Sequence, residues 1–419
     1  MNLRIYRSLL LTILLFIFNL QFSEVKSAEN NIVEVSGIVK NIKNKKVVGN
    51  ASVSVPGTNI GTVTNNEGYF LLKIPSRNLD NGIKVEQIGY HTKLLPLKNI
   101  EKQELEIRLE PSAKVLKEIL VLGGDPREIV ESALKKIPEN YSKEENLFSG
   151  FYRETVQKGN RYISISEAVV DVLKKPYTWR QINGEKVSIN RGRKLLSPVA
   201  SDTLAVKLMG GPYMPVMLDA VKNGDHLFTR EEMNNFEFKM ESGVLIDDRM
   251  HYKIGFKPRV SLDYPLNSGF LYIDGETLTI SRAEFELDMK DKNKVTRSVL
   301  QKKPGGLNFK PLEVSGVVTY KTVDGKSYIN YISSKLRFKC DWKKRWFSST
   351  YTSQAEMVMV DREETGGKKL KFEDTFGKRK IFADYVENYW DADFWKDYNI
   401  IEPTESLEKA VDKLKKGQN

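Results

Sequence analysis

The strongest constraint on this fold is an alternation of apolar and polar residues that runs from about residue 147 to residue 360. From Arg282 to Met289, for example, charged and apolar side chains alternate without a break. A period of two buries one face of a β-strand and exposes the other to water. Turn sequences separate the alternating segments: Lys158-Gly159-Asn160, Asn183-Gly184, Asp274-Gly275 and Asp324-Gly325. Such turns are typical of hairpins, so we expect a large antiparallel β domain, either a half-barrel or a sandwich, over residues 142–365.

Two helices are expected beside this sheet. Asp125 is suited to cap a helix that begins at Pro126, and an apolar stripe continues until Pro138 ends the helix. This helix belongs to a connecting segment, residues 111–141. The second helix is expected within the interruption at residues 202–223, where it runs through Val216 to Val221.

The N-terminal part of the chain predicts a smaller β structure. Residues 32–110 contain about seven short segments with strand character, separated by turn residues. Ala51, Val53 and Val55 alternate with serines, and residues 64–68 form a turn rich in side chains that tolerate positive φ. This pattern is typical of a small sandwich.

Four motifs in this region follow one another in a recognisable order. They are Val-Ser-Gly-Ile-Val at 35–39, Ala-Ser-Val-Ser-Val-Pro-Gly-Thr at 51–58, Gly-Thr-Val-Thr-Asn-Asn-Glu-Gly-Tyr-Phe at 61–70 and Ile-Gly-Tyr at 88–90. The segment resembles the carboxypeptidase regulatory-like domain, a transthyretin-like β-sandwich often found at the start of outer-membrane proteins of Bacteroides-type bacteria. The resemblance implies positioning or docking rather than catalysis. The family's Asp-x-Asp-Gly turn is replaced here by Asn65-Asn66-Glu67-Gly68, which argues against a bound cation.

Two further resemblances concern the rest of the chain. Asn140-Tyr141, followed by Phe-Tyr-Arg-Glu at 151–154, is similar to the start of an uncharacterised envelope protein family of the same bacteria, in which the regulatory-like domain precedes a β-rich region. The segments 269–274 and 279–284 loosely resemble the half-barrels of lipoprotein-carrier proteins. Neither resemblance implies catalytic residues.

The N-terminus carries the features of an export signal. Arg4 and Arg7 precede an apolar run over residues 9–18, and small residues follow at Ser27 and Ala28. We therefore expect a cleaved signal peptide over residues 1–27. No later segment reaches the roughly 18 uninterrupted apolar residues of a membrane-spanning helix. The expected location is the periplasm, the outer membrane as an associated protein, or the exterior after secretion.

Composition and motifs exclude several classes of chemistry. The chain has one cysteine, Cys340, and three histidines, so it can form neither an internal disulfide nor a thiolate metal cluster. It contains no His-Glu-x-x-His, no Gly-x-Ser-x-Gly and no complete phosphate-binding loop. We expect no cofactor, no metal and no catalytic residue identifiable from sequence. Cys340 is expected to be a buried, unreactive thiol, and Asp247-Asp248 a turn.

The net charge of +11 has one focus near the end of the large β domain. Its basic residues lie on one strand face and in the turn that follows: Lys335, Arg337, Lys339, Lys343, Lys344 and Arg345. Because an exported protein rarely meets nucleic acid, the expected partner is an anionic lipid headgroup or an acidic glycan rather than DNA or RNA. The alternative is a solvated sheet face whose lysines prevent edge pairing.

The C-terminal segment, residues 366–419, is acidic and rich in aromatic residues, and a final helix is expected over residues 406–416. These aromatics either pack onto the sheet as a lid or present a surface to a partner. The residues expected to make that contact are Tyr389, Trp390, Phe394 and Trp395.

Two classes of function agree with these features. The first is a non-enzymatic envelope protein that binds a protein partner, a lipid or a glycan, with the regulatory-like domain as an accessory docking module. The second is a glycan or peptide hydrolase that uses a carboxylate pair which the sequence does not locate. An apolar cavity without converging acids favours the first class, whereas two carboxylates about 5–9 Å apart in a cleft favour the second.

Overall fold

The computed structural model describes residues 32–97, 104–112, 124–179, 184–197, 199, 204, 206–208, 210–223, 232–342, 348–365, 370, 374–377, 380–389, 398–404, 409 and 411–412. The signal peptide and most of the expected C-terminal helix lie outside these residues. No helix in the described ranges is long and apolar enough to cross a membrane.

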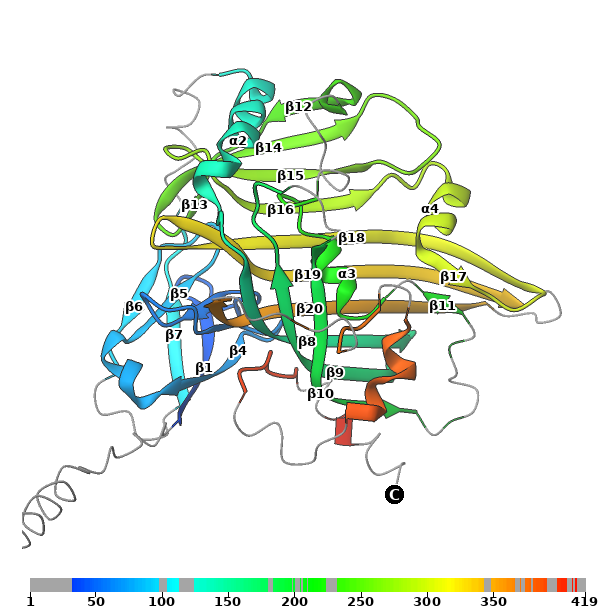
Figure 1. The fold of residues 1–419 in the computed structure, drawn as a ribbon, viewed down its shortest axis with the longest axis horizontal. Coiled ribbons are helices and arrows are strands. Elements are labelled where there is room, and N and C mark those ends of the chain that lie inside the picture. The colour runs from blue at the N-terminus through cyan, green and yellow to red at the C-terminus, as the bar shows by residue number, and fades with distance from the viewer. Residues whose placement is uncertain are drawn as a thin grey trace, which may run out of the picture.

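The N-terminal part is a sandwich of two small sheets (Figure 1). The sheets have the strand orders β4-β1-β7 and β3-β2-β5-β6. Their strands are β1 (Ile32–Asn41), β2 (Ser52–Ser54), β3 (Gly61–Val63), β4 (Tyr69–Pro75), β5 (Ile83–Glu86), β6 (Lys93–Leu95) and β7 (Glu104–Leu109), with a short 3-10 helix, η1 (Ser76–Asn81), after β4. Val53, Phe70 and Ile107 belong to the common core. The predicted small sandwich is confirmed.

An 11-stranded antiparallel sheet forms the rest of the molecule, in the order β10-β9-β8-β20-β19-β18-β16-β15-β14-β12, with β13 also paired to β14. Its strands are β8 (Asn146–Lys158), β9 (Arg161–Lys174), β10 (Lys186–Leu196), β12 (Phe236–Met240), β13 (Val244–Ile246), β14 (Arg249–Pro258), β15 (Asn267–Asp274), β16 (Ile280–Leu287), β18 (Leu307–Val323), β19 (Lys326–Trp342) and β20 (Ser349–Glu364). A separate ladder joins β11 (Lys207–Leu208) to β17 (Leu300–Lys302). The mainly β fold class is confirmed.

Most strands of this sheet pair with their neighbours in sequence, as the predicted hairpins require. The β18–β19 turn places Asp324 at φ 51° and Gly325 at φ 73°, the left-handed conformation that two-residue hairpin turns need. The main exception is the pairing of β8 with β20, which joins the first and last strands of the large β domain. The Asn183 half of one predicted turn lies outside the described residues.

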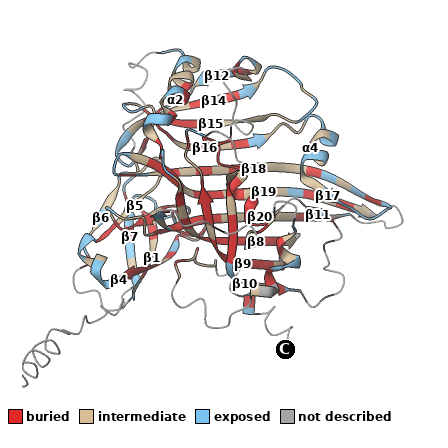
Figure 2. Ribbon diagram, in the orientation of Figure 1, coloured by how far each residue is buried: buried red, intermediate tan, exposed pale blue. Residues whose placement is uncertain are grey.

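The two faces of the large sheet carry different partners. The inner face packs against α2 (Pro126–Asn140), α3 (Tyr213–Met217) and residues from η6 (Phe382–Asp384) and η7 (Val386–Tyr389). The outer face contacts the small sandwich and Ile401. Figure 2 shows that buried residues concentrate in the central strands between these two layers.

Both predicted helices exist, but their ends differ from the expectation. Asp125 caps α2 by accepting a hydrogen bond from the Arg127 amide, as expected. The helix continues past Pro138 to Asn140, because a proline in the last turn removes only one backbone hydrogen bond. The second helix, α3, ends at Met217 rather than near Val221.

The early end of α3 follows from Asp219. Its carboxylate accepts a hydrogen bond from the amide of Lys222 and forms an ion pair with the buried Lys174. These contacts hold the chain in a turn where the apolar pattern alone indicated further helix. A helix that the sequence did not predict, α4 (Lys292–Val299), is capped by the side chain of Asp291.

Candidate functional site

A cavity of about 560 Å³ lies on the inner face of the large sheet. Its floor consists of side chains from two adjacent cross-strand rows. One row runs Val314, Leu336, Ser353, Val156, Ser164 and Leu196, and the other runs Ser334, Ala355 and Glu154, with the Phe285 ring packed over Gly316 beside Ser334. Because the central positions are serine and alanine, the floor leaves space that larger side chains would fill.

The opposite wall comes from segments that cross over the sheet. Leu204, Val206, Met214 and Leu218 lie between β10 and the turn after α3, and Phe382 comes from the C-terminal segment. Figure 1 shows α3 in front of the central strands. The cavity is therefore enclosed by parts of the chain that are far apart in sequence, and most of its lining is apolar.

Glu154 contributes a carboxyl group to the floor. Its Oε2 accepts hydrogen bonds from the Tyr152 hydroxyl at 2.8 Å and from the Gly211 amide at 3.2 Å. Burial raises the pKa of the Glu154 carboxyl, and these two donors oppose that effect only in part. Asp384 supplies a second carboxyl to the cavity lining, but it is half-exposed and pairs with Lys207 at 2.9 Å.

Three of the six predicted basic residues lie within the described part of the structure. Lys335, Arg337 and Lys339 lie on β19 and alternate with Leu336 and Phe338, as expected. Lys335 forms an ion pair with Glu313 at 3.0 Å, and Arg337 is exposed. Lys343, Lys344 and Arg345 lie outside the described residues.

The predicted aromatic contact residues are also described only in part. Tyr389 is partly buried and packs against the inner-face core, whereas Trp390, Phe394 and Trp395 lie outside the described residues. Phe382 packs edge-to-face on Tyr152 with ring centroids 5.3 Å apart, and Val386 is fully buried. The described part of this segment thus covers the sheet, which is the lid arrangement that the sequence allowed.

Cys340 is buried and unpaired. Burial raises the pKa of its thiol to about 11, which keeps the sulfur protonated and poorly nucleophilic at neutral pH. The prediction of an unreactive thiol agrees with this environment.

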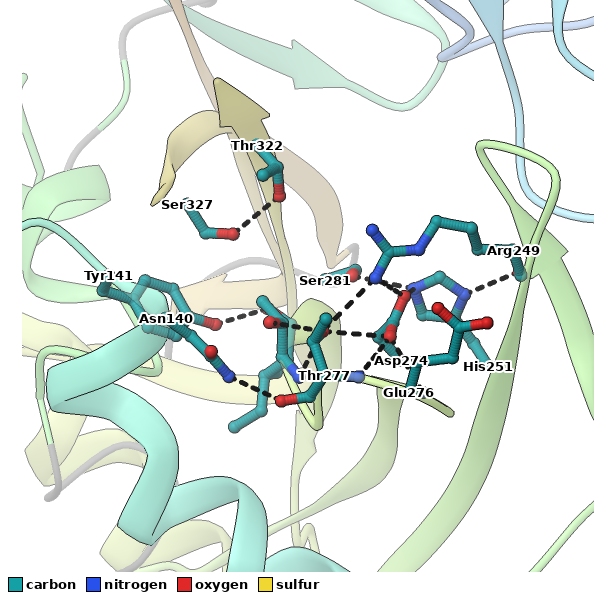
Figure 3. A network of polar contacts seen from close by, with 12 residues as sticks. Asn140, Tyr141, Arg249, His251, Asp274, Glu276, Thr277, Ser281, Thr322 and Ser327 are labelled. Carbon is teal, nitrogen blue, oxygen red and sulfur yellow. Dashed lines mark hydrogen bonds and ion pairs between the residues drawn. The ribbon is translucent and has the colours of Figure 1, made fainter. Parts of the chain in front are cut away.

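Sequence reasoning missed a serine–histidine pair at one end of the sheet (Figure 3). His251 Nε2 lies 2.8 Å from the Ser281 hydroxyl, and His251 Nδ1 lies 2.9 Å from the carbonyl oxygen of Arg249. The two residues are 30 positions apart, on β14 and β16, so no local motif joins them. Asp274 lies on the Nε2 side of the ring, at 3.8 Å, rather than behind Nδ1 as in a catalytic triad. Neither Ser281 nor His251 lines the large cavity.

The network in Figure 3 joins this edge of the sheet to the end of α2. The Asn140 side chain donates to the Thr277 carbonyl at 2.8 Å, and the Tyr141 hydroxyl donates to the Ile280 carbonyl at 2.6 Å. Asp274 accepts hydrogen bonds from the backbone amides of Glu276 and Thr277. These contacts orient a turn and a helix end, and we assign them a structural role.

A second feature missed from the sequence is a buried charged cluster behind α3. Asp219 accepts hydrogen bonds from Lys174 Nζ at 2.7 Å and from the Tyr320 hydroxyl at 2.7 Å. Lys222 Nζ lies 3.7 Å from Glu185, and burial lowers the pKa of Lys222 to about 8. Buried charges are retained when partners compensate their desolvation. The cluster fixes the turn after α3, which contributes Leu218 to the cavity wall.

Another hollow, of about 480 Å³, lies over β12, β14, β15, β16 and β18. It gathers four glutamates: Glu237, Glu241, Glu284 and Glu286. Three of them form ion pairs with basic neighbours: Glu237 with Lys257 at 3.2 Å, Glu241 with Lys239 at 3.0 Å and Glu284 with Arg282 at 2.7 Å. A neighbouring cation favours the charged form of a carboxylate. This hollow is therefore poorly suited to hold the protonated acid that an acid–base pair needs.

The small sandwich is joined to the large sheet by polar contacts at its edge. Asp247 and Asp248 form the predicted turn, with φ 53° and 52°, between β13 and β14. Asp247 pairs with Lys84 at 3.0 Å and Asp248 with His91 at 3.0 Å. The turn therefore docks the two parts of the chain against each other.

The described tail segment, residues 398–404, reinforces the same junction. The Asn399 side chain accepts from the Lys73 amide at 2.6 Å and donates to the Lys73 carbonyl at 3.1 Å. The carbonyl of Ile401 accepts a hydrogen bond from Arg153 at 2.9 Å. We call this segment the strap, because it contacts β4 of the small sandwich and β8 of the large sheet.

Residues 35–121 match the family described as CarboxypepD_reg-like domain, which confirms the resemblance of the N-terminal region to that domain. A search of curated proteins returned no match. Similar solved structures include a DUF1329 family protein from Desulfovibrio piger, which is 12% identical, with coverage of 59% of this chain and 96% of that one and a TM-score of 0.25. A LolA superfamily protein from Nitrosomonas europaea is 14% identical, with coverage of 57% and 97% and a TM-score of 0.23. MucB, in complex with MucA(peri), is 8% identical, with coverage of 57% and 99% and a TM-score of 0.18.

Proposed function

We propose that this chain is an exported envelope protein that holds an apolar or amphiphilic ligand in the cavity of its large β domain. The observation that carries the proposal is the cavity itself. Its volume of about 560 Å³ falls within the roughly 300–1,000 Å³ typical of small-molecule sites. Its floor combines small central residues with apolar ones, as a site for a hydrocarbon chain requires.

The charged groups around the cavity support binding rather than hydrolysis. Among the described lining residues the carboxyl groups are Glu154 and Asp384, and Asp384 is engaged by Lys207. A glycosidase needs one carboxylic acid and one free carboxylate facing the same bond. The sequence-based alternative, a glycan or peptide hydrolase, therefore ranks second.

The remaining parts of the proposal concern location and partners. Removal of residues 1–27 would release the chain into the periplasm, where residues 32–110 would act as the accessory docking module and residues 142–365 as the binding domain. We propose that Lys335, Arg337 and Lys339, with Lys343, Lys344 and Arg345, contact an anionic lipid or glycan surface. Tyr389, Trp390, Phe394 and Trp395 are the proposed contact for a protein partner.

The proposed binding of an apolar ligand in the cavity can be tested with a fluorescent probe and with a substitution that fills the cavity. The mature chain, from Ala28 onwards, should enhance the fluorescence of the apolar probe N-phenyl-1-naphthylamine in a saturable titration. Leu336→Trp places a large ring on the cavity floor and should weaken probe binding about tenfold or more. Leu94→Trp is the matched control, because Leu94 lies on the small sandwich and is 66% exposed. A wild-type chain that fails to bind the probe, or equal binding by both variants, contradicts the proposal.

A further inference from the structure

The arrangement of hydrogen bonds at Glu154 bears on which ligands the cavity prefers. Both donors to this carboxyl in the described residues, the Tyr152 hydroxyl and the Gly211 amide, reach the same oxygen, Oε2. Within the described part of the chain, the other oxygen, Oε1, has no hydrogen-bond partner. The side chain is only partly buried and lines the cavity, so its remaining accessible surface faces the enclosed space.

The neighbours of Glu154 on the sheet leave Oε1 unoccupied. Its partners in register are Ala355 on β20 and Ser166 on β9. Alanine offers no polar group. The Ser166 hydroxyl is buried and makes no hydrogen bond within the described residues. The carboxyl therefore presents one satisfied oxygen to the protein and one free oxygen to the cavity.

We propose that Glu154 is a specificity-determining residue that selects, among the amphiphiles entering the cavity, those whose polar group donates a hydrogen bond. This inference rests on the proposed function, because it names the ligand class of the same cavity. A buried polar atom without a partner is costly, and a hydrogen bond to a carboxylate is among the stronger neutral–charged contacts. A ligand hydroxyl or amine at Oε1 satisfies the free acceptor, whereas an ether or ester oxygen cannot donate to it.

Burial raises the pKa of Glu154, and this agrees with a carboxyl held in an apolar wall without a counter-cation. The cavity lining includes three lysines, Lys194, Lys207 and Lys335. Lys207 pairs with Asp384 at 2.9 Å, and Lys335, whose side chain alternates with the inward-facing Leu336, pairs with Glu313 at 3.0 Å. Lys194 forms no ion pair with Glu154, so within the described residues no lysine donates to Oε1 and a ligand can supply that donor.

The test compares two probes of nearly equal apolar area, 1-dodecanol and 1-methoxydodecane, as competitors for N-phenyl-1-naphthylamine. In the wild-type protein the alcohol should displace the reporter at about tenfold lower concentration than the ether, as expected for one hydrogen bond to a carboxylate. A ratio near one overturns the inference while leaving cavity binding intact. If neither compound displaces the reporter, the proposed function itself fails.

Glu154→Gln gives a sharper test because the backbone fixes the orientation of the new amide. The Gly211 amide can only donate, so the glutamine oxygen must occupy the place of Oε2 and its NH₂ group must face the cavity. The variant should lose the preference for the alcohol, and the ether should bind as well or better. Leu336→Ala is the control, because it removes apolar contact for both probes and should leave their ratio unchanged. A Glu154→Gln variant that keeps the wild-type ratio overturns the inference, and the wild-type comparison stands if that variant fails to fold.

Discussion

Glu154, Glu167 and Glu86 are buried or partly buried carboxyl groups with different neighbours. Burial would raise the pKa of Glu167, but the guanidinium groups of Arg153 and Arg193 lower it overall. Glu154 has neutral donors only, and its pKa stays raised. Glu167 thus belongs to a structural ion-pair cluster under the strap, whereas Glu154 lines the cavity. The difference follows from which side of the sheet each residue faces. Glu167 on β9 pairs in register with Arg153 on β8, and Arg153 and Glu154 are successive residues that point to opposite faces.

Glu86 provides a test of the junction between the small sandwich and the large sheet. Burial raises the pKa of Glu86 to about 7, although Lys84, at 2.8 Å, favours the charged form. A raised carboxyl pKa adds stability that is complete below its ordinary pKa and is lost as pH rises toward the folded value. The wild-type chain should therefore lose stability relative to Glu86→Gln between about pH 4.5 and pH 7, by up to about 3 kcal/mol.

The measurement for Glu86 is urea unfolding of both proteins across this pH range. The difference in their free energies of unfolding should change up to about pH 7 and remain constant above it. Glu313→Gln serves as the control because Glu313 forms a more exposed ion pair with Lys335, and exposed pairs contribute little. A pH-independent difference between wild type and Glu86→Gln would show that this carboxyl is not perturbed.

At the scale of elements, the strap connects parts of the structure that the sheet hydrogen bonds do not. Asn399 makes both of its contacts with the backbone of Lys73 on β4, so its amide takes the place of a neighbouring strand at that edge. The Thr62 hydroxyl on β3 donates to the carbonyl of Ile400 at 2.8 Å. The strap therefore secures both sheets of the small sandwich to the large one.

Replacing Asn399 with alanine should loosen this junction. The change removes one hydrogen bond from the Lys73 amide and one from the Lys73 carbonyl in a buried site, which should cost about 1–3 kcal/mol. Hydrogen exchange at the Lys73 amide should accelerate, and the free energy of unfolding should fall. Asn81→Ala is the control, since Asn81 makes one exposed contact with the Pro56 carbonyl at 3.1 Å. Equal exchange at Lys73 in wild type and Asn399→Ala would contradict the role assigned to the strap.

The elements differ in how far the sequence could predict them. The β18–β19 hairpin follows from local information, because Asp324-Gly325 favours the required turn and the flanking residues alternate. The cavity does not follow from local information. Strand register places Glu154 and Ser353 near each other, and a segment that crosses the sheet adds Phe382. The end of α3 was also mispredicted, since the apolar pattern carries no sign that Asp219 binds Lys174 from another strand. The sequence thus predicts local turns and periodic strands, whereas it does not predict which side chains come into contact across the sheet.

At the scale of the whole molecule, the two faces of the large sheet carry different features. The inner face holds the cavity, and the outer face carries the small sandwich, the strap and the basic residues of β19. Lys335, Arg337 and Lys339 alternate with the inward-facing Leu336, so they project from the same face to which the small sandwich docks. A surface bound there would leave the interior of the cavity unobstructed.

This arrangement predicts that the basic outer face, rather than net charge alone, attaches the protein to an anionic surface. Changing Lys335, Arg337 and Lys339 together to glutamate should reduce co-sedimentation with vesicles of phosphatidylglycerol and phosphatidylcholine about tenfold or more at low salt, since each basic residue near such a surface contributes about 1 kcal/mol. The same change at Lys43, Lys45 and Lys46, which are exposed on the small sandwich, alters net charge equally and should have a much smaller effect. Wild-type binding should also weaken as salt rises, because screening shortens the electrostatic range to about 10 Å at 0.1 M. Equal losses in the two triple variants would assign binding to net charge, and unchanged binding in both would exclude a role for this face.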